Sequence, residues 1–200
     1  KFGTPAAAAY DARTGEIIWS QSPGVDAGRG LSADIDPRHP GEEMWGGPEG
    51  LRTAQGQDIG ARPSTQNFAI WWEGDLLREL LDSNRVMKWN WEKGTTENLL
   101  VAEGAASNNG SKSTPALSAD LFGDWREEVI LRTTDNKALR IYTTTIPTGH
   151  RITTLMHVPQ DSRAISWLNV AYKQPPHPGF YLGDGMNTPA RATLTIAVRK

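Results

Sequence analysis

The chain has 200 residues, with 21 Lys and Arg against 23 Asp and Glu, and a formal net charge of −2. This near balance excludes a strong general attraction to nucleic acid or to an anionic membrane surface, so neither is a predicted partner. The absence of cysteine excludes disulfide bonds and thiolate chemistry, and no apolar run reaches the ~18 residues of a membrane span.

Short strand-like segments separated by turn residues dominate the chain in order. Hairpins are predicted over residues 8–20, 68–81 and 128–143, and further strands over 150–156 and 164–168. Each hairpin joins β-prone residues through a turn rich in Gly, Asp or Asn, and long helical periodicity is missing. The 20 Gly, 13 Pro and 8 Trp suit the same architecture. The sequence therefore predicts an all-β fold.

An internal repeat relates residues 32–45 to residues 118–130. Asp34, Asp75 and Asp120 then mark units of ~40–45 residues, which is the size of a β-propeller blade. We expect about four blades, which either close a small propeller or form part of a larger one. The composition changes after residue 186, so blades are predicted over 1–186 and a linker or unassigned tail over 187–200.

An acidic segment with a central glycine is a candidate calcium loop. Asp120, Asp124 and Glu128 stand at four-residue intervals, and the carbonyls of Phe122 and Arg126 are further candidate ligands. Ca²⁺ takes about six to eight hard oxygen ligands on a flexible loop. The alternative is an acidic β-turn that Arg126 neutralises. Calcium is favoured because unpaired carboxylates at this spacing repel one another.

A second acidic segment is a longer and looser version of the first. Asp34, Asp36 and Glu43 would supply its carboxylates. Here a calcium loop and an ordinary acidic loop remain equal alternatives.

Three further positions suit the recognition of an acidic sugar. Arg29 lies between two glycines, and a guanidinium binds a uronate carboxylate through paired hydrogen bonds, although an ordinary surface arginine is commoner. The polar turn 107–112 ends in Lys112, whose amine is a candidate base, although its composition alone indicates a hairpin loop. Tyr172 stands at a predicted strand end, where a ring can stack on a sugar.

At these segments the chain resembles the rhamnogalacturonan lyases of polysaccharide lyase family eleven. The likeness includes the motifs Asn108-Asn-Gly-Ser-Lys112 and Asp120-Leu-Phe-Gly-Asp-Trp-Arg-Glu-Glu128. Its segments are 10–16, 28–45, 67–72, 74–80, 108–112, 120–128, 139–144 and 169–177. Together they extend over nearly everything from residue 4 to residue 186, so the resemblance is specific.

The resemblance implies a secreted, eight-bladed propeller that binds several calcium ions. Such enzymes cut the galacturonate–rhamnose backbone of rhamnogalacturonan I, a pectic polysaccharide, by calcium-assisted β-elimination at galacturonate. The family's chain is longer, and this chain corresponds to its C-terminal part. We therefore expect the remaining N-terminal blades of the same enzyme as partners. Internal cleavage and cleavage from chain ends both stay open.

The resemblance also assigns roles to residues. It makes Arg29 and Lys112 the catalytic candidates, either of which can be the base. The residues that it places at the sugar are Asn109, Gly110, Ser111 and Tyr172. It implies a further calcium site at Asn169 and Ala171.

The chain departs from the family pattern at two positions. The family usually has Asn at the position of Lys173 and Asp at that of Val158. A cation at residue 173 opposes calcium binding at Asn169 and Ala171. A carbohydrate-binding propeller without turnover, and a structural propeller that calcium only rigidifies, are the alternatives to a lyase. Arg29 and the 109–112 cluster argue against the structural alternative, because rigidity requires neither.

Overall fold

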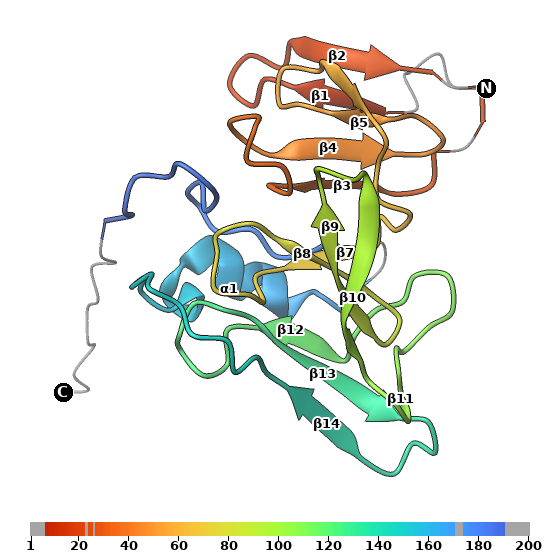
Figure 1. Cartoon of the computed structure of the whole chain (residues 1–200), viewed down its shortest axis with the longest axis vertical. Coiled ribbons are helices and arrows are strands. Elements are labelled where there is room, and N and C mark those ends of the chain that lie inside the picture. Colours follow the sequence, from red (N-terminus) through yellow and green to blue (C-terminus); the bar gives the residue numbers. More distant parts are fainter. Residues whose placement is uncertain (1–6, 23, 26, 171–173, 191–200) are drawn as a thin grey trace, which may run out of the picture.

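The computed structural model describes residues 7–22, 24–25, 27–170 and 174–190. Within them the chain forms a two-stranded hairpin and three antiparallel sheets that follow one another along the chain (Figure 1). The predicted all-β class is confirmed. Neither described helix is long and apolar enough to cross a membrane.

Each sheet is built from strands that are neighbours in sequence. The hairpin pairs β1 (Ala7–Tyr10) with β2 (Ile17–Gln21). Sheet I has the order β3 (Gly30–Ala33), β4 (Glu43–Gly46), β5 (Leu51–Arg52), β6 (Asp58–Gly60). Sheet II has the order β7 (Phe68–Ile70), β8 (Glu79–Asp82), β9 (Arg85–Asn90), β10 (Thr95–Val101). In sheet III, β13 (Glu128–Thr133) pairs with β12 (Leu117–Ala119), β11 (Ala105–Ala106) and β14 (Leu139–Tyr142).

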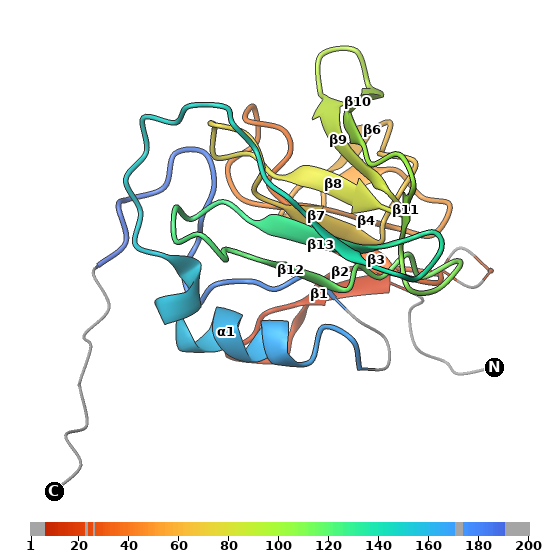
Figure 2. The same cartoon turned by 90° about the horizontal axis from the view of Figure 1, so that it is seen from below.

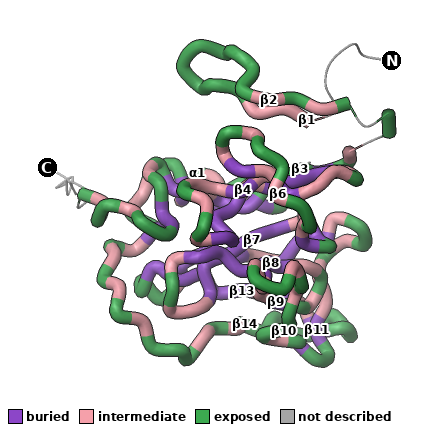
Figure 3. The backbone as a smooth tube through the Cα atoms, turned by 45° about the horizontal axis from the view of Figure 1, so that its top comes forward, coloured by how far each residue is buried: buried purple, intermediate pink, exposed green. Residues whose placement is uncertain are grey.

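Sheet II lies between the other two sheets, and β7 is buried on both faces. Phe68 and Ile70 belong to one apolar core with Val129 and Leu131 of sheet III. Ala69, whose side chain points the opposite way, belongs to a second core with residues of sheet I. Buried residues accordingly concentrate in the middle of the molecule (Figure 3). The described sheets form an open row and no closed ring, so the predicted propeller blades stay a prediction.

Two of the predicted strands are wrong. No strand forms over 150–156, where only a short 3₁₀ helix, η1 (Leu155–His157), begins. Residues 164–166 are the last turn of α1 (Pro159–Ser166), which lies beside β12 (Figure 2), and residues 167 and 168 form a turn after it. Asp161 and Ile165 are buried, and their spacing of four residues places them on one face of α1; Leu168, in the turn that follows, is buried as well.

A buried glutamate opens one strand in each sheet, namely Glu43 in β4, Glu79 in β8 and Glu128 in β13. The Oε2 atom of Glu43 accepts hydrogen bonds from two successive backbone N–H groups that follow β3, at 3.0 and 2.9 Å. Glu79 does the same after β7, at 2.8 and 3.2 Å, and Glu128 after β12, at 2.8 and 3.1 Å. We call these segments loop I (34–43), loop II (71–79) and loop III (120–128).

The glutamates give the correct alignment of the internal repeat. The start of loop II is Trp71, which corresponds to Asp34 and Asp120. Asp75, which was predicted to correspond to them, lies four residues further on and matches Asp124. The predicted repeat is therefore real, but its middle marker was misplaced.

Candidate active site

Polar residues stand shortly before one strand of each sheet, namely β3, β7 and β12. Arg29 precedes β3, Asn67 precedes β7, and the loop 107–114 leads toward β12. The sheets pack side by side, so these strand ends come together although Arg29 and Lys112 are 83 residues apart. A candidate site therefore forms at the end where β3, β7 and β12 begin.

Arg29 is held at the centre of this site. Its Nη1 donates hydrogen bonds to the backbone oxygen of Asn67 at 3.3 Å, to Asn67 Oδ1 at 3.2 Å and to the backbone oxygen of Lys112 at 3.3 Å. Its guanidinium also lies over the Phe68 ring, 5.2 Å from the centroid. Only 6% of Arg29 is exposed, so it is not an ordinary surface arginine.

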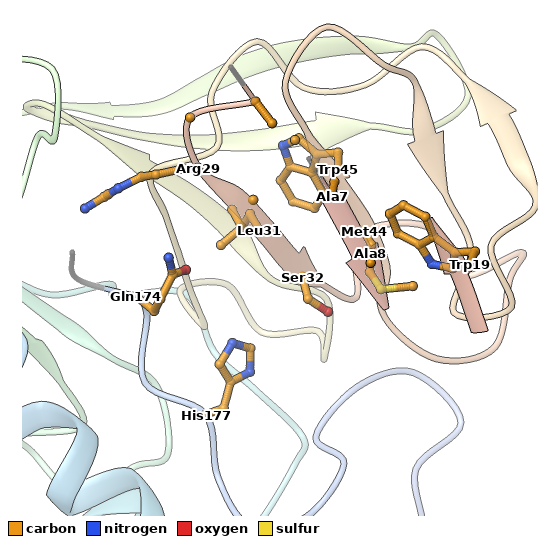
Figure 4. Close-up of a pocket in the computed structure, with 14 residues that line it drawn as sticks. Ala7, Ala8, Trp19, Arg29, Leu31, Ser32, Met44, Trp45, Gln174 and His177 are labelled. Carbon is orange, nitrogen blue, oxygen red and sulfur yellow. The ribbon is translucent and has the colours of Figure 1, made fainter. Parts of the chain in front are cut away.

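Two adjacent cavities share Gly28 and Arg29. The smaller, of about 340 Å³, is polar and is also lined by Asn67, Ser111 and Lys112. The larger, of about 510 Å³, extends along β3 and β4. Arg29 and Gln174 lie at one end of the larger cavity, and Trp19 lies at the other (Figure 4). The guanidinium is therefore placed between a polar hollow and an aromatic one.

The loop 107–114 presents only part of its polar set to the cavity. Asn109 Oδ1 accepts hydrogen bonds from the backbone N–H and the hydroxyl of Thr114, both at 3.2 Å, so this oxygen shapes the loop. Gly110 and Ser111 are exposed, and Ser111 lines the polar cavity with Lys112. The structure thus brings Arg29, Ser111 and Lys112 together at one cavity, and their catalytic and sugar-binding roles stay predictions. Tyr172 lies outside the described residues.

Asn67 and Asp82 are site residues that the sequence did not reveal. Asn67 Nδ2 donates to Asp82 Oδ2 at 3.2 Å and to the backbone oxygen of Ser111 at 3.3 Å, while its Oδ1 accepts from Arg29. One amide therefore links the guanidinium to the loop that carries Lys112. Its position is a usable signal, because Asn67 directly precedes β7 as Arg29 directly precedes β3.

The acidic loops lie at the opposite ends of the same strands. Asp34 directly follows β3, five residues after Arg29, and Asp120 directly follows β12. At about 3.3 Å per residue, an extended segment of five residues spans ~16 Å. A cation in loop I or loop III would therefore not touch a sugar bound at Arg29.

Loop I has two carboxylate oxygens that suit a cation. Asp34 Oδ2 accepts from the Tyr181 hydroxyl at 2.7 Å and from the Asp184 N–H at 2.6 Å. Asp34 Oδ1 and Glu43 Oε1 are buried and have no hydrogen-bond partner among the described residues. Burial raises the pKa of Asp34 to about 6 and that of Glu43 to about 8. These two residues fit a calcium ion, whereas Asp36 already pairs with Arg38 through both carboxylate oxygens.

Calcium is accordingly expected to stabilise the protein through loop I. Saturation at ~100 times the Kd adds about 2.7 kcal/mol to the free energy of unfolding. We expect the melting temperature to rise when Ca²⁺ replaces a chelator, and Asp34→Asn to reduce that rise. Glu97→Gln, on an exposed pair with Lys93, is the matched control. An identical calcium-dependent rise in Asp34→Asn would contradict the site.

The carboxylates of loop III already have hydrogen-bond or ion-pair partners within the protein. The carboxylate of Asp120 accepts from four backbone N–H groups, those of residues 123, 124, 125 and 155. Glu128 Oε1 accepts from the Thr143 hydroxyl at 3.0 Å, and Asp124 pairs with Arg126 at 2.5 Å. These partners suit the acidic turn without a metal ion, and calcium at Asp120, Phe122, Asp124, Arg126 and Glu128 stays a prediction.

The last predicted calcium position is only partly described. Asn169 donates to the backbone oxygen of Ala116 at 2.7 Å and accepts from Asn108 at 3.3 Å, so it ties the segment after α1 to the loop 107–114. Ala171 and Lys173 lie outside the described residues. Calcium at this position therefore stays a prediction.

Known proteins resemble this chain along almost its full length. A sequence model described as "Rhamnogalacturonan lyase family 11, C-terminal domain" matches residues 3–192. The rhamnogalacturonan endolyase YesW of Bacillus subtilis is 60% identical over 177 residues, which are 88% of this chain and 28% of YesW. The rhamnogalacturonan exolyase YesX of the same organism is 49% identical over 207 residues, covering 95% of this chain and 34% of YesX.

The fold agrees with these sequence matches. The crystal structure of YesW superposes with a TM-score of 0.88 and 57% identity, over 91% of this chain and 31% of that one. This chain thus spans about a third or less of the length of the relatives it matches. It belongs to rhamnogalacturonan lyase family 11, in which it matches the C-terminal domain.

Proposed function

We propose that this chain supplies part of the substrate cleft of an enzyme that cleaves rhamnogalacturonan I by β-elimination at galacturonate. The observation that carries the proposal is the convergence of Arg29, Ser111 and Lys112 on one polar cavity. The names of the relatives support the same substrate.

The hydrogen bonds of Arg29 suggest which residue neutralises the substrate carboxylate and which residue removes the proton. Its Nη1 donates to three oxygen acceptors, so it needs its protons where it stands. A fixed guanidinium suits a uronate carboxylate, onto which negative charge spreads when the C5 proton leaves. Lys112, in its neutral form, is then the base. Lys112 Nζ takes the C5 proton, the electron pair of the C5–H bond forms the C4–C5 double bond as the C4–O bond breaks, and the leaving oxygen takes up a proton from the resulting Lys112 ammonium or from water.

Loop I would hold calcium away from this chemistry. When bound at Asp34 and Glu43, the ion would link two buried carboxylates and stiffen the connection between β3 and β4. The residues that orient the sugar are those at the opposite end of β3. We therefore propose that calcium in loop I assists the enzyme by stabilising its structure and not by contacting the substrate.

The sheets themselves support a propeller that extends beyond this chain. Their strands pair antiparallel, and β7 of sheet II shares one apolar core with sheet I and another with sheet III. We propose that they are blades of a larger ring, completed by the part of the enzyme that the relatives have in addition. Secretion is part of the proposal, because a cell-wall polysaccharide cannot cross a membrane.

The proposal is tested on the full-length protein that contains this chain. Incubation with rhamnogalacturonan I and Ca²⁺ is expected to increase ultraviolet absorbance, because each cut leaves an unsaturated uronate. Binding of the polysaccharide without any absorbance gain would show a carbohydrate-binding protein instead. Product sizes would distinguish internal from terminal cleavage, since the relatives include both an endolyase and an exolyase.

A further inference from the structure

Loop II contains a tight cluster of carboxylates. One carboxylate oxygen from each of Glu73, Asp75 and Glu79 lies within 4.8 Å of the others. Among the described residues, no other set of three acidic, histidine or cysteine ligands is this close. Glu79 is completely buried, so a cation is needed to balance its charge.

That cation is already present in the chain. The ammonium of Lys88, which extends from β9, lies 2.6 Å from Glu79 Oε1, 3.0 Å from Asp75 Oδ2 and 3.1 Å from Glu73 Oε2. An ammonium has three hydrogen-bond donors, which matches the three carboxylates. Lys88 therefore fills the space between the oxygens where a metal ion would have to sit.

The other sheets show what this position normally contains. The pairing of β8 with β9 places Lys88 opposite Glu79. The same pairing places Thr143 opposite Glu128 in sheet III and Thr53 opposite Glu43 in sheet I. In sheet III the threonine hydroxyl donates to the glutamate at 3.0 Å. Only sheet II has a side chain at this position that is long enough to enter its loop and carries a positive charge.

We propose that the Lys88 ammonium is the permanent cation of loop II, which therefore binds no metal ion. The calcium dependence expected from the family does not extend to this loop, because metal and ammonium would occupy the same space. Replacing Lys88 with the threonine of the other sheets would open a site for a hard divalent cation such as Ca²⁺. The inference does not depend on the proposed lyase activity.

The test counts calcium ions bound by the full-length protein after metal removal, by isothermal titration calorimetry. Lys88→Thr is expected to bind one more Ca²⁺ than the wild type and to gain an additional calcium-dependent rise in melting temperature. Adding Asp75→Asn to that variant should abolish both gains. The control Lys93→Thr removes a lysine whose pair with Glu97 is exposed, and should change neither value.

A second comparison does not require Lys88→Thr to fold. Asp75→Asn alone should bind as many Ca²⁺ ions as the wild type, because loop II holds none. Loss of one ion in Asp75→Asn would show that calcium displaces the ammonium and would overturn the proposal. A folded Lys88→Thr variant without an extra ion would overturn it as well.

Discussion

Lys112→Ala is expected to lower kcat on rhamnogalacturonan I by about 10²- to 10⁴-fold, the usual contribution of a positioned base. Lys112 lines the polar cavity beside Arg29, and its backbone oxygen accepts a hydrogen bond from the guanidinium. Truncation beyond Cβ removes the amine but leaves that backbone contact in place. The fold and KM should therefore change little, as measured by thermal unfolding and by ultraviolet absorbance of the unsaturated product.

Comparison with Arg29 separates a base from a neutralising group. Arg29→Ala should also abolish turnover, but added primary amines should restore activity only to Lys112→Ala. Lys137→Ala, at an exposed turn of sheet III, is the control for loss of a lysine. Full activity in Lys112→Ala would transfer the role of base to Arg29.

Arg78→Met is expected to lower the free energy of unfolding by about 3–5 kcal/mol, the usual effect of removing one partner from a buried ion pair. Arg78 is 1% exposed and lies 3.6 Å from the buried carboxylate of Glu127. Its guanidinium stacks over Trp71 at 4.1 Å and donates to the backbone oxygens of Ala69 and Pro176. Burial already raises the pKa of Glu127 to about 8, so without Arg78 this carboxyl must either stay charged at a high cost or take up a proton.

Urea unfolding of the full-length protein measures this loss. Combining Arg78→Met with Glu127→Gln should recover part of the stability, because the uncompensated charge is then gone. Lys93→Met, in an exposed pair with Glu97, should leave the unfolding midpoint unchanged. A loss below ~1 kcal/mol in Arg78→Met would show that Arg78 is not essential to this core.

Local sequence patterns predicted the hairpins but not the elements that depend on tertiary packing. The predicted hairpins over 8–20, 68–81 and 128–143 all form, because β-prone runs with a turn between them specify their own pairing. Residues 164–168 have an apolar pattern that suits a short strand as well as a helix. The helix is favoured by Pro159 at its first turn and by a face that buries Ile165.

Local patterns likewise predict only those parts of the candidate site that do not depend on tertiary packing. Arg29 and Lys112 could be named because their residue types and motifs indicate sugar chemistry. Asn67 could not, because its role consists of hydrogen bonds to Arg29 and to Ser111, which lie in loops far from it in the sequence. Equally, the saturation of Asp120 by backbone N–H groups depends on Leu155, 35 residues further along the chain.

The glutamates that open β4, β8 and β13 have a consequence for protein engineering. Each glutamate accepts hydrogen bonds from two backbone N–H groups. These donors lie seven and eight residues before the glutamate in loop I, and six and seven residues before it in loops II and III. Loop I thus accommodates an extra residue between the same two anchor points. Foreign peptides inserted between the glutamate and its two N–H donors would project from the side of the molecule opposite Arg29. The loops on that side could then be redesigned while the cleft keeps its shape.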